Sequence, residues 1–168
     1  MTDSHAALPH EIAKLLPRLR RFARTVTRHT EDADDLVQVA VERALRHAHQ
    51  WQAGTRLDSW LFRIMKNAWI DEVRARSRRD EVPMDDEAED TRGVDDTARH
   101  IARLSVQTAM ARLPEEQRLA VSLVLVEGLP YKEAADVLQV PIGTLTSRLA
   151  RGRLALQALL VDAGGAAQ

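Results

Sequence analysis

Residues 58–79 read DSWLFRIMKNAWIDEVRARSRR, an uninterrupted run that joins a wide apolar face to a basic end. Since the run contains neither proline nor glycine, we expect one helix of about 22 residues and roughly 33 Å, with Asp58 or Ser59 as its N-cap. At 100° per residue the apolar side chains share one side, and the other side carries Arg63, Lys66, Asn67 and Arg74. The first side is expected to pack and the second is able to meet phosphate, although a core helix with a solvated basic end has the same pattern.

The composition of the whole chain favours an all-α fold. The chain has 168 residues, of which 45% are apolar and only 4% aromatic, and a 3.6-residue periodicity recurs along it. It contains no cysteine, which excludes disulfides and favours a reducing compartment. No stretch approaches the roughly 20 apolar residues of a membrane span and the first residues lack a secretory signal pattern, so we expect a cytoplasmic protein without membrane insertion.

The charges are segregated along the chain. Residues 80–96 carry nine acidic residues and one arginine, whereas the remainder has 23 Lys and Arg against 16 Asp and Glu. The acidic segment has too few apolar residues to offset its ordering entropy, so it is expected to be a flexible linker between two small helical domains, 8–79 and 97–162. The acidic segment either serves only solubility or mimics a nucleic-acid strand by its negative charge. In the second case it would occupy a basic channel in a partner or compete with DNA for the chain's own basic surfaces.

Two further amphipathic helices are predicted before residue 58. The first covers about residues 11–29, where Pro17 predicts a kink or a break. The second runs from an N-cap at Thr30 to about residue 49, with an apolar seam on one side. Its outer side includes Val39 among polar residues, either as an ordinary exposed valine or as part of a docking surface for a partner protein.

The loop that follows, residues 49–57, contains Gly54 and one tryptophan, Trp51. Packing of Trp51 against the helices is the favoured interpretation. The alternative is that the loop accepts an unstacked base.

The C-terminal half has the pattern of a helix-turn-helix. Residues 113–116, LPEE, resemble the start of a helix, and Gly128 is suited to end it in the left-handed conformation. A short helix at 131–138, a turn at 139–141 and a last helix to about residue 160 follow. On the last helix Gly152 lies on the buried side, where a missing Cβ permits close packing.

The opposite side of that last helix has the polar groups of a recognition helix. Its first half projects Thr144, Ser147, Arg148 and Arg151 together. Arginines in the major groove either take guanine edges or neutralise phosphates, and a solvated helix face is the remaining alternative.

These segments resemble a known family. The run DADDLVQVAVERAL (32–45), followed by WLFRIMKNAWIDEVRARSRR (60–79), is similar to region two of bacterial sigma factors, and residues 113–156 are similar to region four. Without a middle domain between them, the chain resembles the extracytoplasmic-function, or group IV, sigma factors over about residues 10–160.

The resemblance implies a dissociable specificity subunit of RNA polymerase that directs promoter recognition and melting, with no catalytic residue, cofactor or metal. It assigns core-polymerase binding to Asp34, Asp35, Leu36, Gln38, Val39 and Glu42. It assigns the −10 element to Trp51, Arg63, Lys66, Asn67, Arg74 and Arg76. It assigns the −35 element to Thr144, Ser147, Arg148 and Arg151. The implied partners are core RNA polymerase, promoter DNA and an anti-sigma factor, with a stress or envelope regulon, and the free chain would be a monomer.

Three positions depart from the family pattern. Val39 stands where a glutamate is common, which favours an apolar contact with polymerase. Pro130 replaces a common serine N-cap, and Thr146 replaces a common lysine, whose loss would remove about 0.9 from the salt slope of DNA binding.

Other classes of protein explain less of the sequence. A stand-alone helix-turn-helix regulator leaves residues 58–79 without a role, and a sigma-like decoy would need an input domain for which there is no room. An enzyme would need a paired nucleophile and base or a phosphate-binding glycine loop. His47 and His49 point to different sides of a helix, which disfavours a metal site.

Overall fold

The computed structural model describes residues 3–79 and 97–165, and within them every regular element is a helix. This confirms the all-α prediction. The acidic segment 80–96 lies outside the described residues. The elements are α1 (Asp3–Ala6), α2 (Leu8–Val26), α3 (Thr30–Arg46), the 3₁₀ turn η1 (Ala48–Gln50), α4 (Leu57–Arg78), α5 (Thr97–Arg112), α6 (Glu115–Val121), the π-helical turn η2 (Ser122–Val126), α7 (Tyr131–Leu138) and α8 (Ile142–Gly165).

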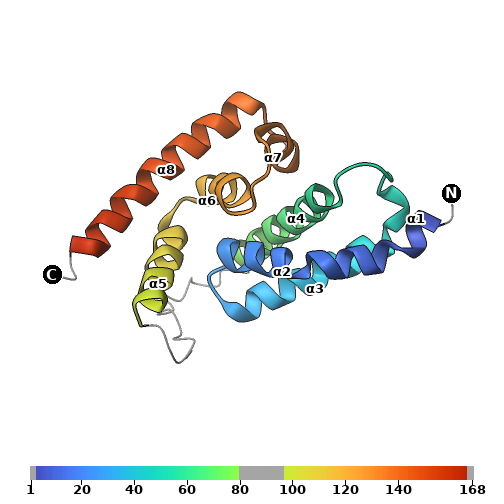
Figure 1. Ribbon diagram of the computed structural model, residues 1–168, viewed down its shortest axis with the longest axis horizontal. Coiled ribbons are helices and arrows are strands. Elements are labelled where there is room, and N and C mark those ends of the chain that lie inside the picture. The colour runs from blue at the N-terminus through green and yellow to red at the C-terminus, as the bar shows by residue number, and fades with distance from the viewer. Residues whose placement is uncertain (1–2, 80–96, 166–168) are drawn as a thin grey trace.

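The N-terminal lobe consists of α1 to α4, with α2, α3 and α4 packed against one another (Figure 1). Its centre is made by the fully buried aromatic rings of Phe22 and Phe62, whose centroids are 4.9 Å apart. Leu19, Leu61 and Met65 complete this centre, each with no exposed surface. The apolar side of the 58–79 run is therefore the side that packs, as its periodicity predicts.

Three local predictions for this lobe are wrong. The break expected as one outcome at Pro17 is absent, because α2 runs as one helix from Leu8 to Val26 with Pro17 inside it. The N-cap of α3 is His29 rather than Thr30, and that of α4 is Arg56 rather than Asp58 or Ser59. Asp58 is held instead by two arginines.

The C-terminal lobe consists of α5, α6, η2, α7 and α8. The helices α6 and α8 cross at Gly152, where an added Cβ would lie 2.8 Å from Val121 Cγ2. This confirms the predicted close approach. Gly128 has φ +70° and ends the turn after α6, also as expected. In the turn between α7 and α8, Gln139 takes the left-handed conformation at φ +56°, which is uncommon for a residue with a Cβ.

The two lobes lie in contact. Figure 1 shows α7 beside α4, and η2 packs against α2. A single cluster of buried apolar side chains runs from one lobe into the other. Because the lobes pack against each other, only the side chains that remain exposed on each helix are free to bind a partner.

Candidate nucleic-acid and polymerase interfaces

The basic side of α4 is partly exposed and partly covered. Arg63, Asn67 and Arg74 are exposed, and their spacing of four and seven residues aligns them along one face. Lys66 is only 4% exposed, and its Nζ donates a hydrogen bond to Gln139 Oε1 at 3.2 Å. Burial, with a smaller contribution from the charge of Arg63, lowers the pKa of Lys66. In this conformation Lys66 is not available to DNA.

Arg76 is engaged inside the N-terminal lobe. Its Nη1 and Nη2 donate to the Asp32 carboxylate at 3.0 and 2.6 Å, and its Nε donates to Glu72 Oε1 at 3.0 Å. The guanidinium also lies 5.9 Å from the centre of the Trp69 ring. Hydrogen bonding to Arg76 lowers the pKa of Asp32 despite partial burial. Arg76 thus joins α4 to α3, and a contact with DNA would compete with these bonds.

Trp51 packs against the core rather than standing free. It is half-buried, and nothing in the described residues accepts a hydrogen bond from its buried Nε1. The residues after it, Gln52 to Thr55, are exposed, with Gly54 at φ +91°. The structure therefore agrees with the favoured interpretation, in which Trp51 packs against the helices. The exposed residues 52–55 lie next to it in the loop.

The outer face of α3 carries most of the side chains that the resemblance assigns to polymerase. Asp34, Asp35, Gln38 and Glu42 are exposed, and Val39 is 36% exposed among them. Leu36 differs, because only 6% of its surface is accessible and it belongs to the core. Leu36 can orient this face from beneath but does not form part of the surface.

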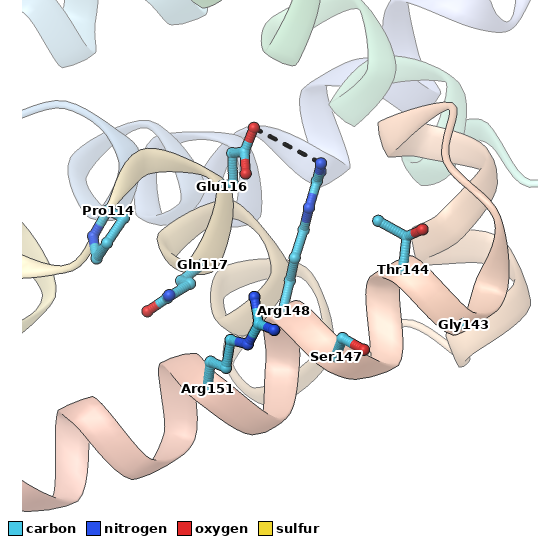
Figure 2. A pocket seen from close by; sticks show the side chains of 8 residues that line it. All are labelled: Pro114, Glu116, Gln117, Gly143, Thr144, Ser147, Arg148 and Arg151. Carbon is cyan, nitrogen blue, oxygen red and sulfur yellow. Dashed lines mark ion pairs between the residues drawn. The ribbon is translucent and has the colours of Figure 1, made fainter.

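Helix α8 and the start of α6 enclose a polar recess. Figure 2 shows Thr144, Ser147, Arg148 and Arg151 of α8 around it, with Glu116 and Gln117 of α6. Arg148 Nη2 lies 3.6 Å from Glu116 Oε1, an ion pair open to solvent on the Glu116 side. All four predicted −35 residues thus meet at one surface, and they are held there by Leu145 and Leu149, which are buried on the opposite side.

Residues for which the sequence predicted no binding role form an ion network between the lobes. The Glu127 side chain has no exposed surface, and Arg21 donates to its carboxylate through Nε at 2.9 Å and Nη2 at 2.8 Å. Arg18 donates to the Glu127 carbonyl at 3.1 Å and to Asp58 Oδ2 at 2.9 Å. Burial acts to raise the pKa of Asp58, but hydrogen bonds from Arg56, Arg18 and the Ser59 amide lower it overall.

The described ranges contain neither a candidate metal site nor a candidate membrane-spanning helix. No group of histidines and carboxylates among residues 3–79 and 97–165 could hold a metal ion, and the rings of His47 and His49 lie edge to face with centroids 6.1 Å apart. None of the helices seen there is both long enough and apolar enough to cross a membrane.

The two lobes, one with a basic helix above a polar loop and one with a helix-turn-helix, define a two-part DNA-binding protein. The family model for Sigma-70 region 2 matches residues 12–79, and that for Sigma-70, region 4 matches residues 103–156. The ECF RNA polymerase sigma factor EcfG of Rhodopseudomonas palustris is 34% identical over 160 residues, covering 95% of this chain and 87% of that protein. SigM of Mycobacterium tuberculosis, another ECF sigma factor, is 38% identical over 143 residues, covering 85% of this chain and 71% of its own length.

A solved structure agrees with these relatives. The sigma factor RpoE of Bartonella quintana, crystallised with the anti-sigma factor NepR, is 31% identical with a TM-score of 0.79, covering 91% of this chain and 96% of that one. The chain belongs to the family of ECF RNA polymerase sigma factors. It therefore acts with RNA polymerase in transcription initiation, and a stand-alone regulator is not favoured.

Proposed function

We propose that the chain binds core RNA polymerase through α3, engages the −10 element through α4 and the Trp51 loop, and reads the −35 element through α8. The observation that carries this division of roles is the convergence of Thr144, Ser147, Arg148 and Arg151 at one recess of a helix-turn-helix (Figure 2). The two proposed domains are residues 8–79 and 97–162, and the linker 80–96 joins them.

Docking on polymerase is supported by the exposed outer face of α3. It combines four polar side chains with Val39, so a partner surface there would need an apolar centre surrounded by positive or hydrogen-bonding groups. The dipole of α3 interacts only weakly with the carboxylates of Asp34 and Asp35, because these residues lie beyond the first turn of the helix. Leu36 supports the surface from the core.

Binding of the −10 element is supported by Arg63, Asn67 and Arg74, which are exposed in line on α4. Trp51, Lys66 and Arg76 would join them only after local rearrangement, because the first is packed, the second is covered and the third is paired. A base stacked on an aromatic ring contributes about 1–3 kcal/mol, which would help to offset the unstacking that promoter melting requires.

The protein is proposed to act in the cytoplasm, where polymerase is found, and to be held in reserve by an anti-sigma factor as a 1:1 complex. The RpoE–NepR relative supports this, because the similarity extends over both lobes. The genes that it directs are proposed to form a stress or envelope regulon.

In vitro transcription tests the proposal. Purified chain, core polymerase and a library of promoters randomised at the −10 and −35 elements should give transcripts enriched in defined sequences at both elements. Omitting the chain is the control and should remove the enrichment. Enrichment at neither element would contradict the proposed division of roles.

A further inference from the structure

The recess beside the start of α8 is lined by two side chains from outside the helix-turn-helix. The helix-turn-helix consists of α7, the turn after it and α8, whereas Glu116 and Gln117 come from α6 (Figure 2). Arg148 Nη2 lies 3.6 Å from Glu116 Oε1 across the recess. One side of the proposed reading surface is therefore acidic. Because the DNA backbone is negatively charged, a carboxylate at this place opposes phosphate binding instead of assisting it.

The packing of α6 within the C-terminal lobe fixes the position of Glu116. An added Cβ at Gly152 would lie 3.2 Å from Gln117 Cβ and 3.3 Å from the Gln117 carbonyl oxygen, so the backbone next to Glu116 is in close contact with α8. Arg118 is only 5% exposed, and its Nη1 donates to two backbone carbonyls at the end of α5, at 3.3 and 3.4 Å. The first turn of α6 is thus held by both α5 and α8.

The two arginines of the recess have different surroundings. Only 26% of the Arg148 side chain is exposed, and its partner Glu116 is 70% exposed. Arg151 is exposed and has no ion-pair partner within residues 3–79 and 97–165. Glu116 therefore acts on one arginine of the pair, the more enclosed one.

A carboxylate beside a guanidinium does not prevent it from reading a base. A guanidinium has five N–H donors in a fixed fork, so a carboxylate at one edge leaves the other edge for an acceptor. Guanine offers two acceptors in the major groove, O6 and N7, that one arginine can take together. The contact of Arg148 with Glu116 is compatible with such a base contact and restricts the directions that the side chain takes.

We propose that Glu116 is a positioning residue for base recognition, which orients Arg148 over the recess so that one edge of its guanidinium faces a base of the −35 element. This inference rests on the proposed function, in which α8 reads that element. The exposed ion pair is weak, so Arg148 keeps enough freedom to adjust to the base. The carboxylate also repels a phosphate at the same place. Glu116 thus raises the selectivity among sequences and not the affinity for DNA in general.

Transcription by the full chain with core polymerase tests this role. The templates share one −10 element and are randomised at the −35 element, and the ratio of transcripts from the preferred base to those from the other bases is measured at each position. Arg148→Ala should lower this ratio most strongly at one or two positions. Glu116→Gln should lower it at the same positions by about two- to fivefold, the range expected for an exposed ion pair.

A double variant separates positioning from other effects. Because no guanidinium remains to be oriented, adding Glu116→Gln to Arg148→Ala should not lower the ratio further. A change in folding would act in either background. Glu116 is exposed, so thermal unfolding of Glu116→Gln should match the wild type, and Glu116→Ala is a second variant with the same expected effect on the ratio.

A charge-matched control is available on the same helix. Asp162 is an exposed carboxylate of α8, about four turns beyond Arg148. Asp162→Asn removes one negative charge, as Glu116→Gln does, and it should leave the ratio unchanged at every position.

The results distinguish the two proposals. If Arg148→Ala leaves the ratio unchanged at every position, the assignment of Arg148 to the −35 element fails. If Arg148→Ala lowers the ratio but Glu116→Gln does not, the positioning role alone is wrong. It is equally wrong if Glu116→Gln acts at different positions or to the same extent without Arg148. More transcription from all templates with unchanged ratios would also overturn it, because Glu116 would then act only through its charge.

Discussion

Several arginines of the N-terminal lobe are held by carboxylates, and in this they differ from the arginines at the start of α8. In the N-terminal lobe Arg76 is bonded to Asp32, Arg56 and Arg18 to Asp58, and Arg18 and Arg21 to Glu127. On α8 of the C-terminal lobe Arg148 has only a 3.6 Å contact with an exposed carboxylate, and Arg151 has no ion-pair partner in the part of the chain that the structure describes.

This difference separates positioning from recognition. A guanidinium bonded to largely buried carboxylates fixes helices relative to one another. Releasing it is costly, because the carboxylate would be left buried without a partner. A guanidinium with weak or no partners can turn toward a phosphate or a base at little cost. The paired arginines of the N-terminal lobe therefore hold its helices together, whereas those at the start of α8, the proposed reading surface, are free to turn toward DNA.

The largest effect is expected on the reading surface. Arg148→Ala or Arg151→Ala should abolish most upstream recognition, because each bidentate contact with a base is worth about 1–3 kcal/mol, or roughly fivefold to 150-fold in affinity. Arg153→Ala is the control, since Arg153 is exposed on the other side of α8. Transcription from a −35-dependent promoter measures the loss, and polymerase binding should be unchanged. Normal transcription by both variants would show that the recognition helix is misassigned.

The frame behind that surface is tested at Gly152. Gly152→Ala should destabilise the C-terminal lobe by about 1–3 kcal/mol, because the new Cβ would meet Val121 at 2.8 Å and a β-branched side chain adjusts poorly. Gly164→Ala, on the same helix with nothing within 4 Å, should instead be neutral or stabilising by up to about 1 kcal/mol. Thermal or denaturant unfolding of both variants checks this, and equal stabilities would contradict the close crossing.

The braces of the N-terminal lobe should respond to acid. Because the pKa of Asp32 is lowered in the fold, its bond to Arg76 stabilises the protein above the unfolded pKa of about 3.9, and this is lost as the pH falls through the folded value. Asp32→Asn should therefore cost about 1 kcal/mol at pH 7, and this cost should shrink progressively as the pH falls below about 3.9 toward about 2. Unfolding measured between those pH values is the check. A deficit that stayed constant with pH would count against the ion pair.

The smallest expected effect is on α3. Val39→Glu should change the affinity for core polymerase by more than the roughly 0.5 kcal/mol of an ordinary surface substitution, or about twofold. Leu45→Glu is a matched control, because Leu45 is also an exposed apolar residue of α3 but is not among the residues assigned to polymerase. Titration with labelled polymerase compares the two. Equal affinity of Val39→Glu and wild type would remove Val39 from the docking surface.

Local features of the fold were predictable from the sequence. Periodicity placed most of the buried sides of α3, α4 and α8, although Leu45 and Ile142, which the same pattern put on those sides, are exposed. The missing side chains of Gly128 and Gly152 predicted a left-handed turn and a close crossing. Each of these depends on residues near one another in the chain. Helix starts were less predictable, because His29 and Arg56 serve as N-caps without a side-chain bond.

Contacts between distant residues were not predictable in this way. Glu127 and Arg21 are 106 positions apart, and Lys66 and Gln139 are 73 apart. Nothing in either local pattern identifies the partner. For the same reason the pattern that placed Lys66 on a polar face could not reveal that α7 covers it, and Arg76 gave no sign of its bond to Asp32.

The most direct test is a titration of the purified chain with core RNA polymerase, in which the size and stoichiometry of the complex are measured. We expect a saturable 1:1 complex that forms without DNA and weakens when the outer face of α3 is altered. A chain that is folded but does not associate with core polymerase at any concentration reached would contradict it.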